Sequence, residues 1–320
     1  MSDIVLEARN LSVHYATRRG PVKAVDGVTL GLGEGETVGV VGETGCGKST
    51  LGKAILGLLP PRTIVQGSLK LRGRELIGMP ASEYRRLRGE QLALIFQDPM
   101  TRLDPLMTIR AHFVETLLAH DRSISRDGAS ERAAEALRSM GIPESRLDHY
   151  PHEFSGGMRQ RIMIAMALVL NPKVLVADEP TTSLDVVVEA QILEILRDLR
   201  RAYAMSVLLI THNLGIVAEV CDRTAVMYAG KIVELGPIDS LFRRPIHPYT
   251  QGLLASTIHL NTTELRSIDG SPPSLLDPPV GCRFHPRCEH MKEICKQQEP
   301  PMVEFRPGHF AACHFGGEFA

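Results

Sequence analysis

A glycine-rich segment near the start of the chain has the residue types and spacing of a phosphate-binding loop. Its nine residues fit the pattern G-x-x-x-x-G-K-[ST]: Gly42-Glu43-Thr44-Gly45-Cys46-Gly47-Lys48-Ser49-Thr50. The Lys48 ammonium can reach the β- and γ-phosphates of a nucleotide, and the Ser49 hydroxyl can ligate Mg²⁺. We expect Gly42, Gly45 and Gly47 to keep side chains out of the space that the phosphates need. The segment therefore predicts a site for a nucleotide and Mg²⁺.

Two carboxylates and a histidine follow apolar segments that are typical of buried strands. Asp178 and Glu179 come directly after residues 174–177, and His212 follows residues 207–210. Ligands of open α/β sheets lie at the carboxyl ends of the strands. We expect Asp178 to hold Mg²⁺ and Glu179 to polarise a water aimed at the γ-phosphate, while His212 contacts that phosphate or the water. The alternatives are a solvated turn for the carboxylates and a structural role for the histidine.

The elements that must position these groups predict an α/β fold around a mixed sheet. Helical periodicity is expected at residues 49–58, after the loop, and again at 108–140, which indicates an inserted helical subdomain. Alternation near the N-terminus and at 68–72 indicates a small antiparallel sheet. Alternation at residues 225–235 is expected to close the main sheet. Short apolar runs predict buried strands at residues 38–41, 92–96, 174–177 and 207–210.

Length and composition place limits on the protein class. A chain of 320 residues with 43% apolar residues suggests about two domains with a substantial core. Its net charge of −1 gives no global attraction to nucleic acid. No apolar run is long enough to span a bilayer, and the first residues lack the features of a signal peptide, so we expect the chain in the cytoplasm. We expect a nucleotide-binding domain at 1–236, with its helical subdomain at about 98–160, and an irregular Pro- and Cys-rich extension at 237–320.

The segment from Phe154 to Arg161 is the first to show a resemblance to a known family. Together with the phosphate loop, Gln97, Asp178-Glu179, Ser183-Leu184-Asp185 and His212, it resembles the ATP-binding subunit of an ABC transporter. Six motifs occur in the family's order between about residues 5 and 236, and as a set they are highly specific. The resemblance implies the phosphate-loop ATPase fold of the ABC type.

A narrower resemblance rests on three segments. Residues 96–101, 150–161 and 247–254 look like the Q-loop, the signature region and the start of the C-terminal extension of oligopeptide/dipeptide importers. Met158 is similar to the form found in the first, D-type, ATPase subunit of such importers. Related importers carry nickel or oligosaccharides, so the cargo stays open.

The resemblance implies a composite ATP site. Two ATPase domains close head to tail, and each ATP lies between the phosphate loop of one chain and the signature of the other. Gln97 would sense the γ-phosphate and Mg²⁺, and Tyr15 would stack on the adenine. A helix headed by Ser155 would supply an N-terminus suited to anions. The expected nucleotide contacts are Tyr15, residues 42–50, Gln97, Ser155, Gly156, Gly157, Gln160, Asp178 and Asp185, and the expected Mg²⁺ ligands are Ser49, Gln97 and Asp178.

The family also implies partners and a location. They are a second homologous ATPase chain, with a homodimer as the alternative, two transmembrane permease subunits and an extracytoplasmic substrate-binding protein. The chain would sit on the cytoplasmic face of the inner membrane as a peripheral subunit.

Four residues depart from the family's usual pattern. Arg102 and Asp104 replace a serine and an asparagine near the expected membrane-subunit contact, and Asn213 replaces an aspartate after His212. Cys46 stands where serine is more common, and an exposed thiol there would make the site thiol-sensitive.

Four of the six cysteines lie in the last forty residues, at Cys282, Cys288, Cys295 and Cys313. In a reducing compartment such a group indicates metal binding before disulfides. The spacing is neither the close-paired pattern of common zinc sites nor a standard ferredoxin run. Similar cysteines in peptide-importer extensions hold a [4Fe–4S] cluster in some cases, so that cluster is expected ahead of Zn²⁺, with unligated thiols as the third reading. His285, His290, His309 and His314 could replace a thiol ligand.

Two other functions fit the sequence less well than transport does. A soluble ABC ATPase acting on nucleic acid would carry two ATPase halves or a long coiled-coil insertion and a basic surface, and this chain has one phosphate loop and no positive net charge. An interaction protein with a dead ATP site is disfavoured because Lys48, Ser49, Asp178, Glu179 and His212 are all present.

Overall fold

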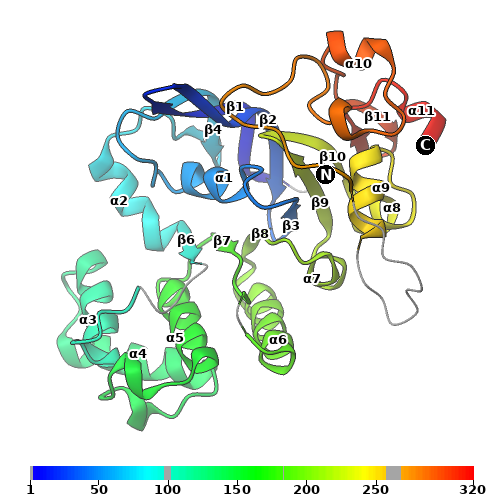
Figure 1. Ribbon diagram of the computed structural model, residues 1–320. Coiled ribbons are helices and arrows are strands. Elements are labelled where there is room, and N and C mark those ends of the chain that lie inside the picture. The colour runs from blue at the N-terminus through cyan, green and yellow to red at the C-terminus, as the bar shows by residue number, and fades with distance from the viewer. Residues whose placement is uncertain (1–2, 97–101, 183, 257–267) are drawn as a thin grey trace. The chain divides into compact units, whose positions relative to one another are not determined.

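The computed structural model describes residues 3–96, 102–182, 184–256 and 268–320 (Figure 1). The chain divides into two units, Met1–Gly78 with Leu208–Ala320, and Met79–Val207. Strand β8 (Ser206–Ile210) crosses the boundary between them. No helix in the described part of the chain has both the length and the apolar character needed to cross a membrane.

The first unit contains the small antiparallel sheet that the N-terminal alternation predicts. Its strand order is β2-β1-β4-β5. The long strands β1 and β2 meet in a hairpin in which Thr17 pairs with Gly20. Leu6 and Ala8 are buried, and so are Leu11 and Val13 after a register shift in β1, so the period-two pattern holds within each half of the strand. The strands are β1 (Ile4–Thr17), β2 (Gly20–Gly33), β4 (Ile64–Leu71) and β5 (Arg74–Glu75).

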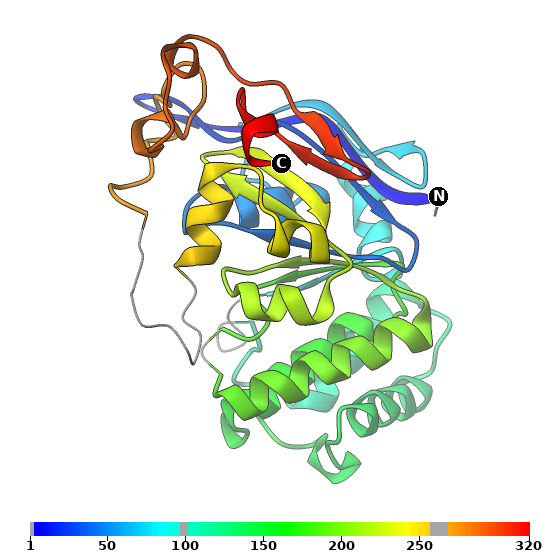
Figure 2. The ribbon, with the colours of Figure 1, turned by 90° about the vertical axis from the view of Figure 1, so that its right-hand side faces the viewer.

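The larger sheet of the first unit is mixed. Strand β3 (Thr37–Val41) is parallel to β9 (Arg223–Tyr228), and β9 is antiparallel to β10 (Lys231–Pro237). The prediction that β10 closes the sheet is wrong. Two short strands of the extension, β11 (Val303–Arg306) and β12 (His309–Ala311), add to it, with Glu234 of β10 opposite Ala311. Figure 2 shows them in red beside β10.

The helices of the first unit follow its strands. Helix α1 begins at Lys48, and α9 begins at Pro248, where proline suits the first turn. Their bounds are α1 (Lys48–Ile55), α7 (Leu214–Val220), α8 (Ile238–Arg243), α9 (Pro248–Ala255), α10 (Glu293–Gln297) and α11 (Gly316–Phe319).

The second unit holds the predicted helical insertion and a parallel strand pair. Strand β6 (Leu92–Ile95) pairs with β7 (Val174–Asp178), and four of the five β7 side chains are completely buried. Thr108 and Ser125 cap the helices that follow them, since each hydroxyl accepts a hydrogen bond from a backbone N–H of the first turn. The helices are α2 (Ala81–Glu90), α3 (Ile109–His120), α4 (Arg126–Ser139), α5 (Gly156–Leu168) and α6 (Val186–Tyr203).

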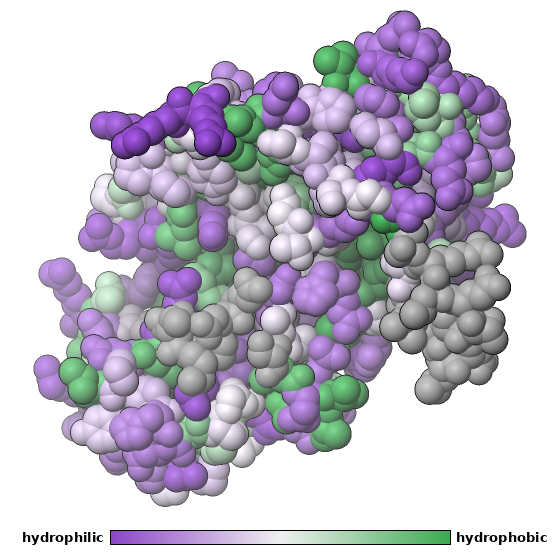
Figure 3. All heavy atoms as spheres, in the orientation of Figure 1, coloured by the Kyte–Doolittle hydropathy of each residue, from purple (hydrophilic) through white to green (hydrophobic). Residues whose placement is uncertain are grey.

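Apolar side chains are scattered among polar ones on the surface of the second unit. On the face drawn in Figure 3, hydrophilic and hydrophobic residues are interspersed. The most exposed large apolar residues of this unit are Leu106, Val186 and Val187, at 85%, 80% and 67%. Leu106 precedes α3, and the two valines open α6 directly after Asp185.

Candidate functional site

The phosphate loop lies between β3 and α1 in the first unit, as predicted. Gly42, Gly45 and Gly47 all have positive φ, which favours glycine. For two of them the structure gives a further reason. A Cβ on Gly47 would lie 2.0 Å from the carbonyl oxygen of Ala24, and one on Gly42 would lie 2.1 Å from that of Met227. These two glycines are therefore required by the neighbouring backbone, and only Gly45 has open space around it.

The Lys48 side chain is hydrogen-bonded to the phosphate loop. Its side-chain ammonium donates to the carbonyl oxygens of Gly42, at 2.7 Å, and Glu43, at 3.1 Å. The residue is buried, at 5% exposure. These two carbonyls hold the cation at the mouth of the loop, where phosphate oxygens can take their place.

Cys46 is buried rather than exposed. Burial raises the pKa of its thiol, although the neighbouring Lys48 ammonium acts in the opposite direction. A protonated, enclosed thiol is a poor nucleophile. A thiol-sensitive site is expected only for an exposed Cys46, and the structure does not meet that condition.

Tyr15, the predicted adenine-stacking residue, lies in β1 of the same unit. Its hydroxyl donates to the Thr50 hydroxyl at 3.1 Å. Thr50 belongs to the phosphate loop, so this bond fixes the aromatic ring to the first turn of α1.

His212 also lies in the first unit, and it is exposed after β8. The next residue, Asn213, caps α7 by accepting bonds from the N–H groups of Gly215 and Ile216. Asparagine and aspartate are equally good helix caps. The departure from aspartate at this position therefore preserves the local structure around His212.

The second unit carries the two predicted carboxylates at the end of β7. Asp178 is 9% exposed. Glu179 adopts a left-handed conformation with φ of 48°, and its carboxylate accepts a hydrogen bond from the Thr182 hydroxyl at 2.9 Å. A strained backbone at a non-glycine residue is typical of a functional position. Sequence reasoning did not identify Thr182, although a hydroxyl three residues after the expected catalytic carboxylate is a usable signal.

The signature forms the start of α5. The Ser155 hydroxyl caps the helix by accepting from the Met158 N–H at 3.3 Å, and Ser155 and Gly156 are exposed. A Cβ on Gly157 would lie 2.6 Å from Cγ1 of Val188 in α6. The start of α5 is thus exposed and capped by Ser155, its binding of an anion stays a prediction, and Gly157 is required by packing within this unit.

Two residues predicted to touch nucleotide have structural roles in the second unit. The Gln160 side chain is 2% exposed and donates to the Pro180 carbonyl at 2.5 Å. Asp185 caps α6 by accepting from the Val188 N–H at 2.9 Å. Their contact with nucleotide stays a prediction. Gln97 and Ser183 lie outside the described residues.

The site residues that the structure describes therefore divide between the two units. The phosphate loop, Tyr15 and His212 belong to the first, and the carboxylates, signature and Asp185 belong to the second. A strand–loop–helix phosphate site, an acidic strand end and an exposed capped helix are the parts of a nucleotide-hydrolysing cassette.

Comparison with known proteins agrees with this geometry. Residues 25–182 match the ABC transporter family, and residues 233–295 match the oligopeptide/dipeptide transporter C-terminal region. The oligopeptide transport ATP-binding protein OppD of Salmonella typhimurium is 46% identical over 98% of this chain and 94% of its own length. The dipeptide transport ATP-binding protein DppD of Bacillus subtilis is 46% identical over 97% of this chain and 94% of its own. The chain belongs to the ATP-binding proteins of peptide ABC transporters.

Solved structures of the family share the fold. A dimeric ATP-binding cassette in a post-hydrolysis state with ADP and Pi matches 73% of this chain and 98% of its own, with a TM-score of 0.66 and 26% identity. The cbiO1 subunit of a Clostridium perfringens transporter matches 76% of this chain and 92% of its own, with a TM-score of 0.65 and 28% identity. Membership of this family makes the chain an ATPase of the ABC type.

The four C-terminal cysteines of this ABC protein line one small cavity, together with His285, His290 and His314. Burial raises the pKa of Cys282 to about 12 and also raises the pKa values of Cys288 and Cys313. Within the described residues no group of three or more His, Cys, Asp or Glu side chains is placed to hold a metal ion. The arrangement therefore gives no support to either expected group, Zn²⁺ or the [4Fe–4S] cluster, and the cluster stays a prediction.

The extension contributes contacts to the phosphate loop that sequence reasoning missed. Both oxygens of the Glu43 carboxylate accept hydrogen bonds from Arg287. The Glu43 N–H donates to the Tyr249 hydroxyl at 2.9 Å. No local pattern could find partners separated by more than 200 residues.

Proposed function

We propose that this chain is the ATP-hydrolysing subunit that powers import of oligopeptides or dipeptides through a membrane ABC transporter. One observation carries the proposal: a phosphate-loop ATPase and a peptide-transporter C-terminal region are joined in one chain, which is 46% identical to peptide-transport ATP-binding proteins over nearly its full length.

The proposed chemistry follows from the parts of the site. Tyr15 stacks on adenine, and the loop N–H groups with Lys48 bind the phosphates. Ser49, Gln97 and Asp178 are the residues that would hold Mg²⁺, which neutralises charge on the β- and γ-phosphates. Glu179 accepts the proton of a water that attacks the γ-phosphorus in line with the bond to ADP. His212 contacts the γ-phosphate or the water. The bond between the γ-phosphorus and the β–γ bridging oxygen breaks, releasing ADP and phosphate.

The signature serves a second ATPase domain in this proposal. Its support is the exposed N-terminus of α5, capped by Ser155 and followed by Gly156 and Gly157. Exposed Val186 and Val187 begin α6, whose Val188 contacts Gly157, so an apolar edge borders the same helix end. The relative with ADP and Pi is described as dimeric. We infer a head-to-tail pair of ATPase domains, with Gln160 and Asp185 beside the shared nucleotide and a homologous second chain as the expected partner.

The other inferred partners are two transmembrane permease subunits and an extracytoplasmic substrate-binding protein. The chain would then act as a peripheral subunit at the cytoplasmic face of the membrane. Leu106, which is 85% exposed at the start of the helical insertion, supports a permease contact there. Closure is driven because ATP binds the closed pair more tightly than the open one, and hydrolysis resets it.

For the four cysteines we propose a [4Fe–4S] cluster with a structural role. The support is that all four thiols line one cavity, which matches the four-thiolate ligand set of such clusters. Protein purified without oxygen should contain iron and sulfide, and Cys295→Ser should lose both. Wild-type protein without iron would refute this part of the proposal.

The transport proposal is tested with the complete complex in proteoliposomes. Uptake of an externally added radiolabelled tripeptide, and of external ⁶³Ni²⁺, is measured with ATP enclosed in the vesicles, on the side where this subunit lies. ATP-dependent peptide uptake that disappears with Lys48→Ala supports the proposal. Nickel uptake without peptide uptake, or ATPase activity stimulated by DNA, would overturn it.

A further inference from the structure

One residue of the phosphate loop is bound by the C-terminal extension on two sides. The Arg287 guanidinium donates to both Glu43 carboxylate oxygens, at 2.7 and 3.0 Å. On the other side, the Tyr249 hydroxyl accepts from the Glu43 backbone N–H at 2.9 Å. The residue directly after the first loop glycine is therefore fixed through both its side chain and its backbone.

The Arg287 side chain is buried and held in this position by several hydrogen bonds. It is 5% exposed, and it also donates to the carbonyl oxygens of Ile268 and Asp269 and to the Tyr228 hydroxyl. The hydrogen bonds to Glu43 raise the pKa of Arg287 further above its usual range. A planar guanidinium that pairs with both oxygens of one carboxylate fixes its direction as well as its distance. The pair is thus a rigid link between the extension and the loop.

The part of the extension that carries Arg287 is itself anchored to the ATPase core. The rings of Tyr228, Tyr249 and Phe284 pack together with centroids 4.5 to 5.4 Å apart. Tyr228 ends β9, so the cluster joins the core sheet to α9 and to the segment just before Arg287. The packing of these rings fixes the position of the segment that carries Arg287.

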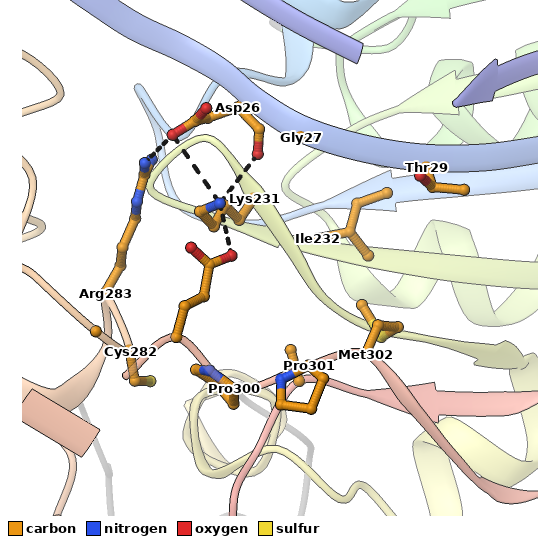
Figure 4. Close-up of a pocket in the computed structure, with 13 residues that line it drawn as sticks. Asp26, Gly27, Thr29, Lys231, Ile232, Cys282, Arg283, Pro300, Pro301 and Met302 are labelled. Carbon is orange, nitrogen blue, oxygen red and sulfur yellow. Dashed lines mark hydrogen bonds and ion pairs between the residues drawn. The ribbon is translucent and has the colours of Figure 1, made fainter. Parts of the chain in front are cut away.

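A second arginine anchors the same segment from the other end. Arg283 donates to the Ala229 carbonyl oxygen and to the Asp26 carboxylate. Figure 4 shows it reaching Asp26 beside a cavity of about 220 Å³, where Lys231 also approaches Asp26. Gly230 follows Ala229, and its N–H donates to the Cys46 carbonyl oxygen in the phosphate loop. Arg287 therefore contacts the loop directly, at Glu43, while Arg283 is connected to it through Ala229 and Gly230.

We propose that Arg287 is a positioning residue for ATP binding, through which the C-terminal extension sets the affinity of the phosphate loop. Two physical effects act together. The pair fixes the entry of the loop, so that less of the loop has to be ordered when ATP binds. The guanidinium also compensates the Glu43 carboxylate, which would otherwise place a negative charge beside the triphosphate.

The effect should fall on binding rather than on the chemical step. Arg287 and Glu43 act on loop order and local charge in the ground state and the transition state alike, so KM changes and kcat does not. Arg287→Met should raise KM for ATP about 3- to 30-fold, the usual range for a residue that acts through a coupled neighbour. Arg287→Lys keeps the charge but loses the paired geometry, so it should lie between wild type and Arg287→Met.

A double variant separates the electrostatic role from simple structural support. In Glu43→Gln/Arg287→Met the uncompensated charge is gone, so KM should return part of the way toward wild type. The measurements are steady-state ATPase kinetics of the assembled complex and binding of a fluorescent ATP analogue to the full-length chain. Arg306→Met is the matched control, because Arg306 lies in the same extension and its side chain donates to the Arg244 carbonyl oxygen rather than to Glu43.

Each outcome of these measurements either supports or overturns the proposal. A raised KM with kcat unchanged in Arg287→Met, partial recovery in the double variant and a silent control support the proposal. A KM for Arg287→Met within twofold of wild type, or a double variant that is no better than the single one, would overturn it. If Arg287→Met does not fold, Arg287→Lys decides: an unchanged KM in that folded variant also overturns the proposal.

Discussion

His247 gives the extension a dependence on pH that can be worked out from its surroundings. The residue is 1% exposed at the start of α9, where its ring Nδ1 accepts a hydrogen bond from the Tyr249 N–H at 3.1 Å. Burial lowers its pKa from 6.5 to about 4, although the nearby Glu234 carboxylate acts in the opposite direction. The imidazole is therefore neutral in the folded protein at pH 7, and protonating it costs stability.

The direction in which pH changes stability follows from the pH at which each state binds the proton. The unfolded chain protonates this histidine near pH 6.5, while the folded chain resists until about pH 4. As the pH falls through this window, the unfolded state gains a proton that the folded state lacks, so stability is lost. One pKa unit is worth about 1.4 kcal/mol, so the full loss is about 3 kcal/mol, and no more is lost below pH 4.

The variant His247→Asn removes the titrating group and keeps an acceptor suited to a helix N-cap. The assay is hydrogen exchange of the α9 amides, read as a free energy of local opening, at several pH values between 7.5 and 4. Wild type should lose about 3 kcal/mol more than the variant over this range. His152→Asn, at an exposed histidine of the second unit, should follow wild type. Equal losses in wild type and His247→Asn would refute the reasoning.

Three further predictions follow from other buried contacts. Cys46→Ser should keep full ATPase activity, and a maleimide should leave the folded wild type active, because the thiol is buried with a raised pKa; rapid inactivation would contradict this. Gly157→Ala should lower the melting temperature, since its Cβ meets Val188, and Gly157→Ala/Val188→Ala should recover most of the loss in a thermal melt; no recovery would show that packing is not the cause. Glu234 and His309 are both fully buried and lie 2.7 Å apart, so Glu234→Leu should cost about 3–5 kcal/mol in urea unfolding, and a cost below about 1 kcal/mol would exclude the pair as a stabilising contact.

The parts of the site that are set by local sequence could be predicted. The phosphate loop, α1 and the carboxylates after β7 each depend on a strand, a turn and a helix that are adjacent in the chain. The small antiparallel sheet also followed from its period-two pattern, because one of its faces is buried. Helix α1 stops at Ile55, before the predicted end at residue 58, since Gly57 adopts a positive φ ahead of two prolines.

The parts that depend on distant packing could not be predicted. Strands β11 and β12 are short and follow Pro300 and Pro301, so their strand character comes from long-range pairing: β12 pairs with β10, and β11 pairs with β12. The need for glycine at 42 and 47 comes from the backbone of β9 and β2, not from the phosphates alone. The Glu43–Arg287 pair joins residues 244 positions apart, and only the folded chain reveals it.

The central claim, that this chain hydrolyses ATP with Glu179 as the base, is tested most directly by one substitution. Glu179→Gln is compared with wild type and with Glu194→Gln, an exposed glutamate of α6, in the complex with its partner subunits. We expect the Glu179 variant to bind the fluorescent ATP analogue as wild type does and to hydrolyse ATP about 10²- to 10⁴-fold more slowly, while Glu194→Gln stays active. Hydrolysis by Glu179→Gln within twofold of wild type would contradict the account.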